Sequence, residues 1–115
     1  MSTDTKDAAY LYDISVAAKE VGEFVAGLSF SDFEKDKKCR YAVERQLLVI
    51  GEAANHLSET ITTANPEIPW ANMVGLRNII AHDYGEVLVE RVWVVAKKNI
   101  PQLITQIDPL LKSFS

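Results

Sequence analysis

Apolar residues recur at three- and four-residue steps through most of the chain, which is the spacing that gathers side chains into one stripe along an α-helix. The first of these stretches predicts a helix over residues 6–27, with Gly27 as its expected end. Its stripe consists of Tyr10, Ile14, Ala17, Val21, Phe24 and Leu28. No stretch shows the strict alternation of a half-buried strand, so the pattern favours an all-α protein.

A second, longer helix is predicted from residue 31 to about residue 62. Ser31 and Glu34 have the spacing of a capping box, in which each side chain satisfies a free backbone N–H at a helix start. Gly51 interrupts the apolar face at a cost of roughly 1 kcal/mol relative to alanine. A glycine in that position indicates that another part of the molecule approaches the backbone closely there.

Prolines mark the boundaries in the rest of the chain. Pro66 and Pro69 predict an extended connection that leads into a third helix over residues 70–84, where Gly85 can take the left-handed conformation of a helix end. A fourth helix over residues 92–107 contains Pro101.

Because Pro101 lacks a backbone donor, we expect it to kink or divide that fourth helix. The pattern also allows a fifth, short helical turn over residues 109–114. The prediction is an all-α bundle of four main helices that forms one domain over residues 1–115.

Composition and charge exclude several classes of protein. The net charge of −4 opposes a non-specific nucleic-acid coat, which needs a broad surplus of Lys and Arg, but it allows a small and locally basic site. No apolar stretch approaches the roughly 20 residues that cross a bilayer. The single cysteine, Cys39, forms no internal disulfide, and the opening residues lack the pattern of a signal peptide. We therefore expect a cytoplasmic protein that is not inserted in a membrane.

The stretch RNIIAHDYGEV, residues 77–87, gathers Arg77, Asn78, His82 and Tyr84. Histidine titrates near neutral pH and can move a proton, while arginine presents a permanently charged fork to phosphate oxygens. RNA cleavage needs both a proton-transfer group and a positive charge, because the ribose 2′-hydroxyl must be activated and the phosphorane must be stabilised. Such a scheme demands no metal ion.

Direction along the helix complicates this interpretation. On an ideal helix over residues 70–84, His82 points about 140° away from Arg77, while Tyr84 shares the stripe of Arg77. The two groups can converge if the last turn is distorted towards Gly85, or if a second copy of the chain supplies one of them. The residue types alone also fit an ordinary helix flank, on which Asp83 is solvated and Tyr84 covers the core.

Three other features suggest chemistry less strongly. Glu52 and His56 share a helix face, but the paired Glu-x-x-His spacing of a di-iron bundle is absent from the sequence, so we expect no metal site. Cys39 lies on an apolar stripe and is expected to be a small core residue. The mixed run 34–40 is typical of a solvated helix face, although its basic residues could line an approach for RNA. These basic residues are Lys37, Lys38 and Arg40.

Together these residues resemble a known family. RNIIAHDY matches the R-x4-H-x-Y pattern of HepT-like proteins, a minimal branch of the HEPN superfamily. Other segments occur in the order and approximate spacing of that family, so that the resemblance covers nearly the whole chain. These segments are YDI at 12–14, IGEAANHL at 50–57, NPEIPW at 65–70, Val92-Trp93 and IPQL at 100–103.

The resemblance implies a HEPN-type bundle that forms a homodimer, with the two motif helices at a shared cleft. It further implies a metal-independent endoribonuclease without cofactors, in which Arg77 and His82 are the catalytic pair and Asn78 supports them. Such proteins are the toxins of toxin–antitoxin pairs. The partner, an MntA-type nucleotidyltransferase antitoxin, can transfer AMP to the motif tyrosine, here Tyr84, and so block the site.

Two alternatives remain open at this point. One is a catalytically weak HEPN domain that serves as the binding partner and substrate of its nucleotidyltransferase, and the other is a dimerisation module without chemistry. The chain also departs from the family pattern after the tyrosine. It has Gly85 and Leu88 where an aromatic residue and an aspartate are expected, so the family pattern does not define the shape of this loop or its contacts with a partner.

Overall fold

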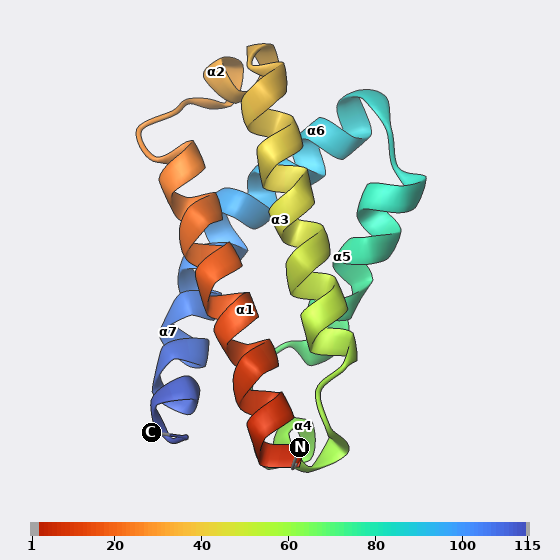
Figure 1. The fold of residues 1–115 in the computed structure, drawn as a ribbon. Helices are drawn as coiled ribbons and strands as arrows, with labels where there is room; N and C mark the ends of the chain where they lie inside the picture. The colour runs from red at the N-terminus through yellow and green to blue at the C-terminus, as the bar shows by residue number, and fades with distance from the viewer. Residues whose placement is uncertain (1–2, 115) are drawn as a thin grey trace.

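The computed structural model describes residues 3–114, and these residues form helices joined by short connections, without strands. In Figure 1 the main helices lie side by side, in the order α7, α1, α3, α5. Helix α1 packs against both α3 and α7, and α3 packs against α5. The main helices are α1 (Thr3–Val25), α3 (Lys37–Asn55), α5 (Trp70–His82) and α7 (Ile100–Lys112). The predicted all-α bundle of four main helices is therefore confirmed.

One apolar cluster joins these helices. The sequence stripes of the first two predicted helices account for much of it, because Ile14, Val21, Leu47 and Ile50 are fully buried. Burying a side chain of this size stabilises a fold by roughly 1.5–3 kcal/mol. No helix within residues 3–114 has both the length and the apolar character of a membrane span.

The predicted helix over residues 31–62 is divided into three. Its first part, α2 (Phe30–Lys35), begins at a capping box, but the pair is Ser29 and Asp32 rather than Ser31 and Glu34. The Asp32 backbone N–H donates to Ser29 Oγ (3.1 Å), and the Ser29 N–H donates to Asp32 Oδ2 (3.0 Å). The chain then breaks at Asp36, whose carboxylate accepts from the Cys39 N–H (3.0 Å) and starts α3.

The second break separates α3 from α4 (Glu59–Ala64), which begins at Ser58. The buried carboxylate of Asp7 on α1 accepts from both the backbone N–H (3.0 Å) and the hydroxyl (2.6 Å) of Ser58. Ser58 Oγ in turn accepts from the Ile61 N–H (3.3 Å). A contact between α1 and this connection therefore ends the long helix, which the local pattern could not reveal.

The C-terminal half is nearly one continuous helical path, made of α6 (Gly85–Val94), the π-helical turn η1 (Val95–Asn99) and α7. Pro101 is the second residue of α7, so the path is divided just before this proline, by the π-helical turn η1 and not by a break in the helix. Helix α7 continues through Pro109 to Lys112, and the short turn expected over residues 109–114 is thus its last part rather than a separate helix.

Helix α5 ends at His82, two residues earlier than predicted. Asp83 and Tyr84 are extended, and Gly85 has a φ of +64°. The left-handed conformation expected at Gly85 is confirmed, although this residue starts α6 rather than closing α5. The resulting turn directs the chain from α5 into α6, at the upper right of Figure 1.

We predict that Asp7→Ala lowers the free energy of unfolding by about 2 kcal/mol, because it leaves two donors of Ser58 without their charged acceptor. Urea denaturation measures the loss. Asp13→Ala, an exposed aspartate on the same helix, is the matched control and should change stability little. Equal stability of the two variants would contradict the role given to Asp7.

Gly85→Ala should lower the free energy of unfolding by about 1 kcal/mol, since alanine is strained at positive φ. Gly85→Asn should lose less, because asparagine tolerates this conformation better. The control is Gly75→Ala within α5, where an added methyl group meets no atom within 4 Å and stability should be kept or raised. Thermal unfolding of the three variants tests this order, and a Gly85→Ala protein as stable as the wild type would refute it.

Candidate functional site

Arg77 lies where α5 crosses α3. A methyl group built on Gly51 would come within 2.7 Å of Arg77 Cγ and 3.1 Å of the Met73 carbonyl oxygen. Real carbon atoms do not approach so closely, so only glycine admits the arginine stem at this point. The close approach predicted at Gly51 is confirmed, and what approaches is the helix that holds the motif.

The head of the same side chain pairs with the next residue of α3. Arg77 Nε lies 2.8 Å from Glu52 Oε1. The two side chains remain 39% and 54% exposed, so water screens the pair and its contribution to stability is small. The contact therefore places the guanidinium beside Glu52 and adds little to the stability of the fold.

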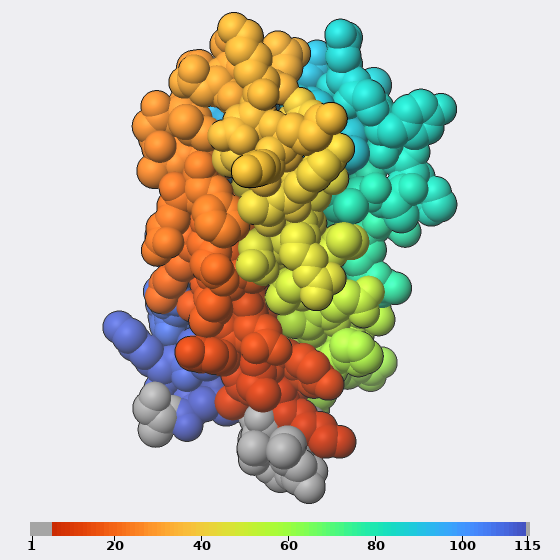
Figure 2. Space-filling model, turned by 45° about the horizontal axis from the view of Figure 1, so that its top comes forward, coloured from red at the N-terminus to blue at the C-terminus, as the bar shows by residue number. Residues whose placement is uncertain are grey.

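The other motif residues lie at the surface around the end of α5. Asn78 and His82 are exposed, and Tyr84 is 84% exposed. Tyr84 lies in the extended turn, so the prediction that it shares a helix stripe with Arg77 is wrong. In Figure 2 the end of α5 and the turn after it form the projecting edge on the right of the molecule.

Within residues 3–114, no hydrogen bond or ion pair joins Arg77 to His82. Arg77 is directed against α3, whereas His82 is the last residue of α5 and is open to solvent. The structure therefore brings Arg77 next to Glu52 and leaves His82 accessible beside Tyr84.

The turn has one anchor that the sequence did not indicate. Arg91 Nε on α6 lies 3.3 Å from Asp83 Oδ2, and this oxygen is shielded from solvent. The geometry is that of an ion pair without a hydrogen bond, because within the described residues Oδ2 has no hydrogen-bond partner. This attraction holds Asp83, which lies between His82 and Tyr84, against α6. No local spacing rule predicts a pair of residues that are eight positions apart with Gly85 between them.

The candidates for metal binding have other partners. Glu52 meets Arg77, and the ring of His56 stacks on Tyr10 with 5.3 Å between ring centroids. The part of the chain that the structure describes contains no group of three or more His, Cys, Asp or Glu side chains able to hold a metal ion. The arrangement at Arg77 and His82 instead offers a fixed cation and an accessible imidazole.

Cys39 shows no sign of a nucleophile. Desolvation by burial, and then the nearby Asp36 carboxylate, raise the pKa of the Cys39 thiol, which disfavours the reactive thiolate. Its Sγ lies 3.5 Å from the Phe24 carbonyl oxygen, which is consistent with the expected packing role.

Of the basic residues in the run 34–40, Lys37 and Lys38 are exposed at the start of α3.

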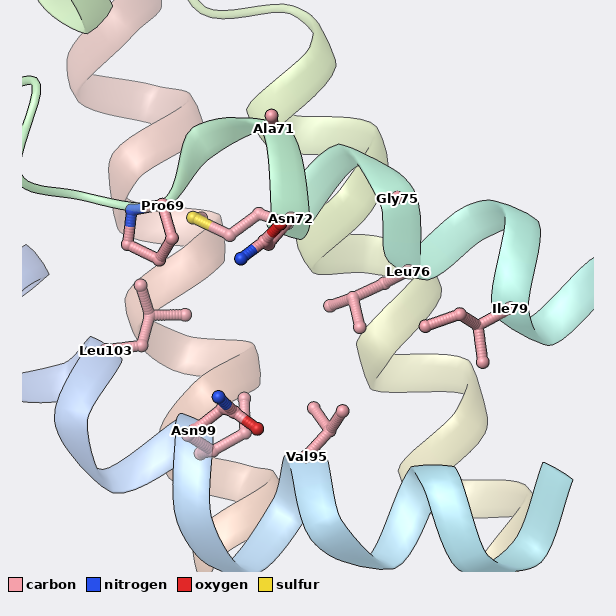
Figure 3. Close-up of a pocket in the computed structure, with 11 residues that line it drawn as sticks. Pro69, Ala71, Asn72, Gly75, Leu76, Ile79, Val95, Asn99 and Leu103 are labelled. Atoms are coloured by element: carbon pink, nitrogen blue, oxygen red, sulfur yellow. The ribbon is translucent and has the colours of Figure 1, made fainter. Parts of the chain in front are cut away.

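An apolar cavity of about 340 Å³ lies between α5 on one side and η1 and α7 on the other. Leu76, Ile79, Val95 and Leu103 point into it, as Figure 3 shows. None of the motif's polar residues lines this space. The polar residues of the motif therefore lie on the surface around the end of α5 and not in this cavity.

Comparison with known proteins bears on the same residues. A family model described as Ribonuclease HepT-like matches residues 14–110. A "putative RNase" of Methanocaldococcus jannaschii is 36% identical over 100 residues, which cover 87% of this chain and 92% of that protein. A "probable ribonuclease HepT" of Thermococcus cleftensis is 38% identical over 103 residues, covering 90% of this chain and 94% of that one. No solved structure matches the chain.

The matched range includes the helices that hold Arg77, Glu52 and His82 as well as the turn with Tyr84. It also includes most of the apolar core, so motif and scaffold are matched together. The chain belongs to the HepT-like ribonuclease family.

Proposed function

We propose that this protein is a metal-independent endoribonuclease that acts as the toxin of a toxin–antitoxin pair. The single observation that carries the proposal is an Arg-x4-His-x-Tyr motif at an exposed helix end, in a chain of a ribonuclease family. The arginine is held in one place by α3, and the histidine and tyrosine are accessible to a macromolecular substrate or partner.

The proposed reaction involves two proton transfers and requires stabilisation of the negative charge that develops on the phosphorane. As a base, His82 removes the proton of a ribose 2′-hydroxyl, whose oxygen attacks the adjacent phosphorus. The bond from phosphorus to the 5′-oxygen breaks, that oxygen receives a proton, and a 2′,3′-cyclic phosphate remains. Arg77 stabilises the negative charge of the phosphorane, and Asn78 donates a hydrogen bond to phosphate or orients the imidazole.

A homodimer supplies what one protomer lacks. One His82 can act as base while the partner copy's equivalent histidine protonates the leaving oxygen, and Arg77 need not reach the histidine of its own chain. The surface near the motif turn has apolar side chains available for such an interface. Val87 and Val94, seven residues apart on α6, are 55% and 51% exposed.

Regulation by a nucleotidyltransferase antitoxin is supported by the exposure of Tyr84. In the proposed step the Tyr84 phenol gives its proton to a base of the nucleotidyltransferase, its oxygen attacks the α-phosphorus of ATP, and pyrophosphate leaves. Tyr84 is two residues from His82, so the attached AMP would occupy the approach to the imidazole and add negative charge where RNA phosphate must bind.

We expect Arg77→Ala and His82→Ala each to lower the rate of RNA cleavage by at least about 100-fold, because each removes one required service. The assay uses purified, unmodified protein and a fluorescent RNA in the presence of a chelator. His56→Ala is the control, since His56 is the other histidine of the chain and stacks on Tyr10. Cleavage by His82→Ala at the wild-type rate would reject the assignment.

We further predict that incubation with its cognate nucleotidyltransferase, ATP and Mg²⁺ attaches one AMP group to the protein, and that Tyr84→Phe prevents this. Intact-mass spectrometry measures the modification, and the RNA assay measures its effect. Tyr41→Phe is the control, because Tyr41 is another exposed tyrosine. Modification of Tyr84 in a protein that cleaves no RNA would favour the alternative function, a binding partner and substrate without catalysis.

A further inference from the structure

Two consecutive residues of α3 contact the motif arginine. Gly51 lies against its stem, because a methyl group there would be 2.7 Å from Arg77 Cγ and 3.4 Å from Cδ. Glu52 meets its head at Nε, 2.8 Å away. We name Gly51 and Glu52 together the arginine seat.

The seat acts on two different parts of one side chain, and this limits how Arg77 can lie. A guanidinium is planar, so a carboxylate bound at Nε leaves the Nη1–Nη2 edge available for a second anion. Within residues 3–114, no other hydrogen bond or ion pair engages this guanidinium. This free Nη1–Nη2 edge can donate hydrogen bonds to two phosphate oxygens at once.

We propose that the arginine seat is a positioning element, in which Glu52 and Gly51 hold Arg77 in the orientation that stabilises the phosphorane. The proposal rests on the proposed ribonuclease activity. Preorganisation of a charge is valuable because no side-chain freedom has to be lost at the moment of reaction. The exposed ion pair adds little to stability, so removing Glu52 should affect orientation and leave folding intact.

The kinetic test is Glu52→Gln, which removes the charge and keeps the size of the side chain. We expect kcat to fall by about tenfold while KM stays the same or decreases, since an anion near the RNA phosphate is also lost. Glu44→Gln on the same helix is the matched control and should cleave like the wild type. An unchanged kcat in Glu52→Gln would mean that Glu52 does not position the arginine, and a higher kcat would mean that Glu52 masks it. Either result would overturn the proposal.

Combining variants tests whether Glu52 acts through Arg77. In the Arg77→Ala background, Glu52→Gln should cause no further loss of kcat, because the group that it positions is gone. A further tenfold loss would show that Glu52 contributes independently of Arg77 and would also overturn the proposal. Gly51→Ala should reproduce the loss of kcat by displacing the arginine stem, whereas Gly75→Ala, where a methyl group has open space, should not.

A measurement that does not depend on RNA cleavage can test the arginine seat separately from the proposed ribonuclease activity. In nuclear magnetic resonance spectra, the Nε–H signal of Arg77 should be resolved and slow to exchange with water in the wild type. It should lose this protection in Glu52→Gln and Gly51→Ala, but not in Glu44→Gln or Gly75→Ala. If the wild type cleaves no RNA, the proposed function fails while this signal still tests the seat. An unprotected Arg77 Nε–H in the wild type would refute the seat whatever the activity.

Discussion

The close approach of α5 to α3 is the contact on which the geometry of the candidate site depends. At Gly51 the absence of a side chain lets Arg77 lie across the backbone of α3, with the Met73 carbonyl also near. Helix α3 is in turn held by α1, whose apolar stripe fills the core. The arginine is therefore positioned by the main packing of the bundle, and a shift of α5 along α3 would displace it.

The fold class could be predicted from the sequence because the apolar period persists over most of the chain, and the stripe residues Ile14, Val21, Leu47 and Ile50 are buried as expected. The helix boundaries could not be predicted so well. The break at Ser58 depends on a carboxylate 51 residues away, that of Asp7, which interrupts a helical pattern that would otherwise continue. Local pattern thus predicts which residues face the core, and tertiary hydrogen bonds decide where the helices end.

The candidate site could be predicted only in part, because the sequence shows residue types and local spacing but not contacts between distant segments. The residue types at Arg77 and His82 indicated phosphate and proton chemistry, and Gly51 indicated a close approach. The pairing of Arg77 with Glu52 joins two helices across 25 residues of sequence, and no spacing rule identifies it. The predicted position of Tyr84 was wrong because α5 ends at His82. Tyr84 therefore lies outside the helix and not on the stripe of Arg77.

This early end of α5 separates two residues, Arg77 and Tyr84, to which we assign different roles. Arg77 is held between two packed helices, whereas Tyr84 projects from an extended turn anchored by Asp83 to Arg91. In the proposed regulation, the partner enzyme therefore reaches the exposed tyrosine without displacing the arginine. Since the proposed modification adds its charge beside His82 and leaves the packing of α3 with α5 intact, it can block RNA access while the fold and the position of Arg77 are preserved.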